Sequence, residues 1–146
     1  MGGVALRCGH RSLSAVLLAI FLSGGSAVAE PVDKAVAAAR AAVSKLTPKD
    51  AGGRHGQALG AVETCVGMTL TERASALSSV YAGADLEAFK TQSAKIYNAW
   101  IKVKHCIQQD DPNQCRIIVD ESCAAAIAEI GPSGTALPDL LEAPKR

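Results

Sequence analysis

Aromatic residues and clustered charges are both scarce in this sequence. It has one tryptophan, two tyrosines and two phenylalanines among 146 residues, and no run of five like charges. Proteins that bind nucleic acids need a concentrated positive surface, and those that bind single strands also need aromatic rings on which bases stack. The composition therefore argues against a nucleic-acid partner and against docking on an anionic membrane surface.

Sequence motifs of known chemistry are missing as well. No two cysteines lie closer than eight residues, so the Cys-x-x-Cys pair of thiol redox enzymes and of c-type haem attachment is absent. The Gly-x-Ser-x-Gly motif and the phosphate-binding loop are absent too. His105 and Cys106 are adjacent and would point about 100° apart on a helix, which does not favour a zinc site. We predict no catalytic residue, no cofactor and no metal.

The first 29 residues are typical of a secretory signal peptide. Basic residues at Arg7 and Arg11 precede an apolar run from Leu13 to Leu22, and Ala27-Val28-Ala29 supplies small residues before a cleavage point. The apolar run is about half the ~20 residues that a membrane span needs. We therefore expect a cleaved signal, a periplasmic or secreted protein, and no transmembrane segment in the mature chain.

Four cysteines remain after the predicted cleavage, namely Cys65, Cys106, Cys115 and Cys123. An even number in an exported protein predicts a disulfide framework. Cys115 and Cys123 fall on one predicted helix, where they are ~12 Å apart along the axis, too far to be bridged. Two pairings remain, the nested Cys106–Cys115 with Cys65–Cys123, and the crossed one. We prefer the nested pairing because Cys106 and Cys115 are nearly symmetric about a predicted turn between antiparallel helices.

The residue pattern predicts an all-α fold, a small bundle of four to five helices stapled by two disulfides. Alternating strand patterns are missing apart from Ile117-Ile118-Val119. The domain division that we expect is a signal peptide over 1–29, a helical domain over 30–131 and a flexible C-terminal tail over 132–146. Within the domain, the expected helices cover residues 33–46, 57–66, 69–81, 85–109 and 111–130.

The segment Lys49 to Gly56 is rich in glycine and is expected to be an exposed loop. Thr47-Pro48 precedes it and should end the first helix, because a residue before proline avoids the α conformation. Exposed loops on a rigid scaffold often carry function. Arg54 and His55 are therefore candidate partner contacts.

The clearest helical pattern covers residues 85–109, where apolar or small residues recur at spacings of three and four. They are Leu86, Phe89, Ser93, Ile96, Trp100, Val103 and Ile107. We expect Phe89 and Trp100 to be core anchors. For a ligand bound between helices, the candidate contacts are Trp100, Tyr97 and His105.

Three short segments carry a family resemblance. Ala99-Trp100-Ile101, His105-Cys106 and Gln114-Cys115-Arg116 resemble the C-terminal half of a family of small exported lysozyme inhibitors. Members of that family are helical and disulfide-linked, so the resemblance implies a similar architecture and an inhibitory role.

The absence of a recognisable reaction centre favours a non-enzymatic protein over an enzyme. The main hypothesis is a small exported binding, inhibitor or accessory protein whose partner is another envelope protein. The alternative is a small-ligand carrier, or an enzyme, with a site between helices around Trp100.

Overall fold

The structure, a computed structural model, describes residues 29–106 and 111–143. These residues form five α-helices, α1 (Ala29–Ala42), α2 (Pro48–Thr64), α3 (Glu72–Ala76), α4 (Gly83–Cys106) and α5 (Pro112–Ile130), with a 3-10 turn, η1 (Leu77–Val80). Two strands of two residues each, β1 (Thr69–Leu70) and β2 (Leu141–Glu142), pair antiparallel. The prediction of a mostly helical fold is confirmed, whereas the predicted signal peptide lies outside the described residues apart from Ala29.

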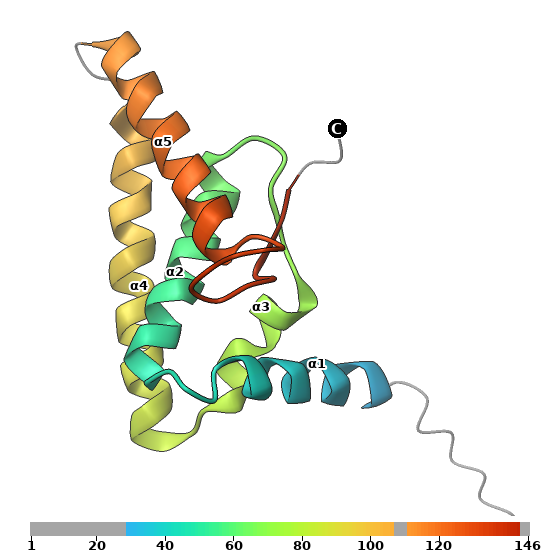
Figure 1. The fold of residues 1–146 in the computed structure, drawn as a ribbon. Coiled ribbons are helices and arrows are strands. Elements are labelled where there is room, and N and C mark those ends of the chain that lie inside the picture. The colour runs from blue at the N-terminus through green and yellow to red at the C-terminus, as the bar shows by residue number, and fades with distance from the viewer. Residues whose placement is uncertain (1–28, 107–110, 144–146) are drawn as a thin grey trace, which may run out of the picture.

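The helices pack around one long pair, α2 and α4, which run parallel: Gly52 meets Phe89, and Glu63, further along α2, meets Lys104 further along α4 (Figure 1). α2 lies alongside α4, and this is the most extensive contact between elements. α5 returns beside the C-terminal half of α4, while α1 runs across the other end of the pair. The segment after α5 loops past the end of that helix and comes back beside the segment that precedes α3. α2 therefore lies at the centre of the fold, in contact with α4, α5 and β1.

The expected loop between Lys49 and Gly56 is wrong, because this segment forms the first half of α2. The Thr47 hydroxyl accepts a hydrogen bond from the Asp50 amide at 3.1 Å and so caps the helix. Pro48 occupies the first helical position, where its missing N–H has no helical partner to lose. Thr-Pro thus starts a helix here, although the same pair also fits a helix end.

Glycines of α2 allow α4 to approach unusually closely. A Cβ added at Gly52 would lie 2.2 Å from the carbonyl oxygen of Phe89, and one at Gly56 would lie 2.2 Å from that of Ser93. Any side chain at these positions would push the helices apart. A glycine inside a helix destabilises it by about 0.5–1 kcal/mol relative to alanine, and packing against α4 offsets this loss.

The flexible tail expected from residue 132 onward is also wrong over residues 132–143. Leu137, Leu140 and Leu141 are at most 1% exposed and belong to the main hydrophobic core, together with Phe89 and Leu77. The Leu140 amide donates to the Ile130 carbonyl at 3.0 Å. Leu137, Leu140 and Leu141 follow Gly131-Pro132-Ser133-Gly134, and Pro138 lies among them. Because these breakers favour an irregular segment, the sequence alone does not show that the leucines cover the core.

Both cysteine pairs lie at disulfide distance, in the nested arrangement. Cys65 bonds Cys123 with Cα atoms 5.8 Å apart, and Cys106 bonds Cys115 with Cα atoms 5.4 Å apart. Asp111 caps α5, since its carboxylate accepts from two amides of the first turn. One disulfide therefore ties the α4–α5 hairpin, and the other ties the end of α2 to the middle of α5.

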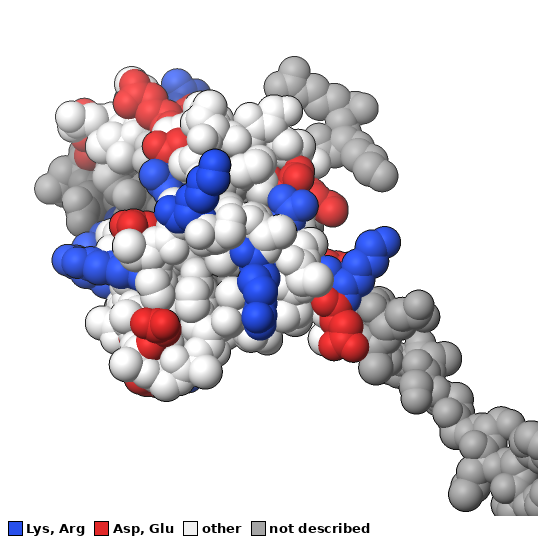
Figure 2. Space-filling model, turned by 60° about the horizontal axis from the view of Figure 1, so that its bottom comes forward, with Lys and Arg blue, Asp and Glu red and all other residues white. Residues whose placement is uncertain are grey.

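Other helix starts also differ from the expected ones. α1 begins at Ala29, four residues before the expected start at 33. α3 begins at Glu72 instead of 69, because Thr69 is part of β1 and the Thr71 hydroxyl caps the helix by accepting from the Ala74 amide at 3.1 Å. α4 begins at Gly83, two residues before the expected start at 85. Charged residues of both signs are scattered between neutral ones on the face drawn in Figure 2, in keeping with the formal net charge of +1.

Candidate functional site

An open cleft of about 830 Å³ lies between α2, α4 and α5. We call it the Trp100 cleft. It has an apolar wall from α4 and a polar wall made by α2 and the last turn of α5. Small-molecule sites are usually clefts of about 300–1,000 Å³ with apolar walls and a few placed polar groups. The Trp100 cleft has both the size and this division of its walls.

The apolar wall follows one stripe of α4. Ile96, Trp100 and Val103 are spaced by four and three residues, which puts them on one face of the helix. A Cβ added at Gly60 would lie 2.2 Å from the Trp100 Cβ, so α2 supports the indole from behind. Trp100 is only partly buried. The seam predicted from sequence is present from Leu86 to Val103, whereas Ile107 lies outside the described residues. Its tryptophan lies at the edge of the core and faces the cleft.

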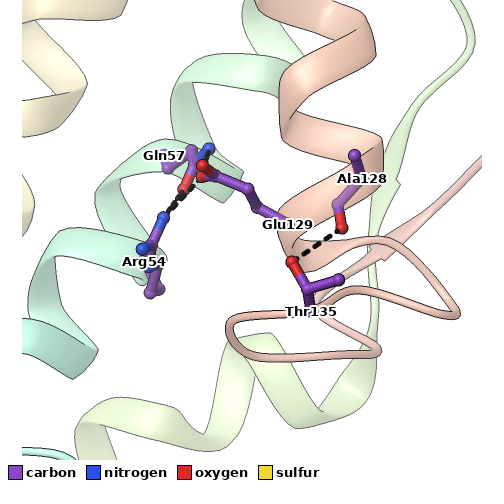
Figure 3. Close-up of polar contacts among 5 residues, drawn as sticks. All are labelled: Arg54, Gln57, Ala128, Glu129 and Thr135. Carbon is purple, nitrogen blue, oxygen red and sulfur yellow. Dashed lines mark hydrogen bonds and ion pairs between the residues drawn. The ribbon is translucent and has the colours of Figure 1, made fainter.

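The polar wall is a cluster of Arg54, Gln57 and Glu129 (Figure 3). Arg54 Nη1 donates to Gln57 Oε1 at 3.1 Å and forms an ion pair with Glu129 Oε2. Gln57 Nε2 also donates to Glu129 Oε2, at 2.8 Å. Arg54 and Gln57 are one turn apart on α2, whereas Glu129 comes from α5. The cluster exists only because the two helices meet.

The segment after α5 fixes the position of Glu129. The Leu137 amide donates to the Glu129 carbonyl at 3.1 Å, and the Thr135 amide donates to the neighbouring Ala128 carbonyl at 3.0 Å. The Thr135 hydroxyl reaches the same Ala128 oxygen at 3.3 Å. These bonds satisfy carbonyls that the end of a helix otherwise leaves without partners. The polar wall is therefore held by backbone contacts as well as by its ion pair.

A second feature, His55 against Ser93, lies in the α2–α4 contact. The His55 Nδ1 and the Ser93 Oγ are 2.8 Å apart, and the imidazole packs on the Phe89 ring at 5.1 Å. Burial lowers the pKa of His55 below its ordinary value of 6.5. Burial, with a contribution from Asp85, raises the pKa of Tyr81, whose ring packs on Phe89 from another direction.

The distance between His55 and Ser93 would suit a general base and a nucleophile, but a substrate could not reach the Ser93 oxygen. Ser93 is only 6% exposed, whereas a nucleophile must reach its substrate. Within residues 29–106 and 111–143, no hydrogen bond joins His55 to a carboxylate that would orient its ring. The pair joins two helices and does not present a reactive oxygen.

The structure brings together two of the residues suggested by sequence and separates the other three. Trp100 and Arg54 line the same cleft. His55 faces Ser93, His105 is exposed in the last turn of α4, and Tyr97 is partly buried outside the lining of the cleft. Sequence reasoning missed Gln57 and Glu129, because no local pattern links residues on helices 72 positions apart.

A second groove of about 490 Å³ lies between α1 and α3. Among the described residues, its walls include the apolar Val32, Val36 and Leu70 and the charged Glu72. It lacks a cluster of convergent polar groups of the kind found in the Trp100 cleft.

Within the described part of the chain, no group of three or more metal-ligating side chains comes together. No helix in that part is both long and apolar enough to cross a membrane. The chain matches no known protein family, no curated protein and no solved structure. The case for function therefore depends on the geometry of the cleft.

Proposed function

We propose that this protein is an exported, non-enzymatic binding protein and that the Trp100 cleft is its binding site. The observation that carries the proposal is the cleft itself, about 830 Å³ in volume, with an apolar stripe around Trp100 opposite the polar cluster of Arg54, Gln57 and Glu129. An apolar wall supplies affinity by desolvation, and a few fixed polar groups supply orientation.

Export is part of the proposal and is supported by the cysteines. Two disulfides form and persist in oxidising compartments and are rare in reducing ones. The signal-like pattern of residues 1–29 points the same way. A periplasmic or secreted location agrees with both.

Of the two occupants considered from sequence, the cleft favours a small ligand over an envelope-protein partner. The sequence-based hypothesis of an inhibitor rested on the absence of a reaction centre and on the family resemblance. The cleft instead supplies a positive feature, since its volume lies within the range of small-molecule sites. We therefore place the small-ligand carrier first and keep a protein partner as an outcome of the test.

The test uses the single tryptophan. The chain has one indole N–H, so a proton–nitrogen correlation spectrum of the oxidised protein has one indole signal, which reports on the cleft. We expect this signal and the amide signals of Gly53 and Gln57 to shift when small molecules extracted from the periplasm or the culture medium are added. Shifts confined to the α1–α3 groove, or seen only with a protein from the same source, would refute the small-ligand site. Turnover of the bound molecule would refute the non-enzymatic role.

A further inference from the structure

We infer that the ligand of the Trp100 cleft is an amphipathic carboxylate, with its apolar part against the Trp100 stripe and its carboxylate on Arg54. This inference rests on the proposed binding site and adds the chemical class of the ligand. Three observations carry it: the unused donors of Arg54, the presence of Lys49 without an ion pair among the described residues, and the carboxylate of Glu129 on the same guanidinium.

The Arg54 guanidinium uses only part of its donor capacity. Both of its hydrogen bonds, to Gln57 and to Glu129, come from Nη1. Its Nε and Nη2 make no hydrogen bond to any other described residue. A guanidinium carries five N–H groups, and neighbouring N–H groups match the two oxygens of a carboxylate. Arg54 can therefore take a second carboxylate without releasing Glu129.

The other charged groups of the cleft leave room for an anion. Two are acidic, Asp50 and Glu129, and each already accepts hydrogen bonds, Asp50 from the Thr47 hydroxyl at 2.6 Å and Glu129 from Arg54 and Gln57. Lys49 lines the cleft beside them and forms no ion pair with the described residues, and the formal charges of the four charged lining residues balance. The free N–H donors of Arg54, rather than the net charge, therefore select a negatively charged ligand group.

Glu129 would share the Arg54 guanidinium with this class of ligand. Its carboxylate lies on the same guanidinium and is held there by Gln57 and by the end of α5. A second carboxylate on Arg54 is attracted by the guanidinium and repelled by Glu129. Neutralising Glu129 should therefore strengthen carboxylate binding, whereas removing Arg54 should weaken it.

The experiment compares three probes that share one alkyl chain, namely octanoate, octanol and octyltrimethylammonium, below their aggregation concentrations. Binding is measured by calorimetry and by the indole signal of Trp100. We expect octanoate to bind roughly ten- to a hundredfold more tightly than the other two, the range for a charge-assisted hydrogen-bonded pair. Arg54→Gln should remove this preference and leave octanol binding unchanged, while Glu129→Gln should increase octanoate affinity severalfold.

Lys104→Gln is the matched control, because Lys104 pairs with Glu63 at 2.9 Å and does not line the cleft. It should leave all three affinities unchanged. Equal binding of octanoate and octanol, or tighter binding of the cation, would overturn the carboxylate assignment while the binding site itself stands. An unmoved Trp100 signal with every probe, together with ligand shifts elsewhere, would overturn the binding site as well.

Discussion

Replacing glycines of α2 by alanine should have opposite effects on stability at neighbouring positions. At Gly53 the nearest atom to an added Cβ is the Gln92 Cγ, 3.8 Å away, which is ordinary van der Waals contact. At Gly56 the nearest atom is the Ser93 carbonyl oxygen, 2.2 Å away. Both substitutions remove the conformational freedom of a helical glycine, so the difference between them isolates the close approach of α4.

The expected magnitudes follow from these distances. Gly53→Ala should raise the free energy of unfolding by about 0.5–1 kcal/mol, the usual gain for alanine within a helix. Gly56→Ala gains the same amount but forces the α4 backbone away by about 1 Å, and overpacking of this kind costs about 1–3 kcal/mol or more. The Ser93 oxygen belongs to a helix backbone and cannot rotate aside. We therefore expect Gly56→Ala to be about 1–2 kcal/mol less stable than the native protein.

Urea unfolding of the oxidised protein measures both variants. Far-UV circular dichroism follows the helices, and Trp100 fluorescence follows the α2–α4 contact, where the indole packs on Gly60. Matching transitions and equal denaturant slopes are needed before the free energies are compared. If Gly56→Ala stabilised the protein as much as Gly53→Ala, the backbones of α2 and α4 would not be in contact at Gly56, which would refute the close approach of the two helices.

Three further outcomes are expected. Because burial lowers the pKa of His55, the unfolded chain takes up a proton where the folded one does not, so stability should fall as the pH drops below 6.5. His55→Asn should flatten this dependence in a pH series of unfolding curves, and an unchanged slope would contradict the assignment. Leu140→Ala should lower the free energy of unfolding by about 2–5 kcal/mol because Leu140 is fully buried. A change near zero would instead support a flexible C-terminal tail. Serine in place of both cysteines should cost about 4 kcal/mol for Cys65–Cys123 and about 2.5 kcal/mol for Cys106–Cys115, since their sequence separations are 58 and 9; the reverse order in denaturant would refute this entropic account.

Helix starts and helix faces can be predicted from sequence where the pattern that defines them lies within one short segment. Asp111 followed by proline predicts a capped helix start, and the structure has that cap. The seam from Phe89 to Val103 predicts a long helix whose apolar face packs inward, and α4 follows it. Both patterns are periodic over consecutive residues, so they can be read without knowing what packs against them.

The glycine-rich segment shows why another part could not be predicted. Glycine lowers helix propensity, and Gly52, Gly53 and Gly56 within five residues favour a loop when α4 is not considered. In the folded protein the spacing of four between Gly52 and Gly56 matches the contact with α4. The energy that makes this segment helical comes from packing with a distant helix.

The candidate site was predictable only in part, for a similar reason. Trp100 is a candidate because it is the single tryptophan and lies on the α4 seam. Arg54 is a candidate from the sequence as a loop residue, whereas the structure places it on α2. Gln57 and Glu129 have no distinguishing local pattern. Their roles follow from two hydrogen bonds that connect α2 with the end of α5.

The helical class and the capped start of α5 can be predicted from the sequence alone, because periodicity and capping act within short segments. Cysteine spacing reduced the disulfides to two pairings. Only the tertiary structure decided that glycines form the face of α2 that contacts α4, that the C-terminal leucines cover the core, and that Arg54 meets Glu129 beside Trp100. Each of these depends on the close packing of residues far apart in the chain, which no local pattern encodes.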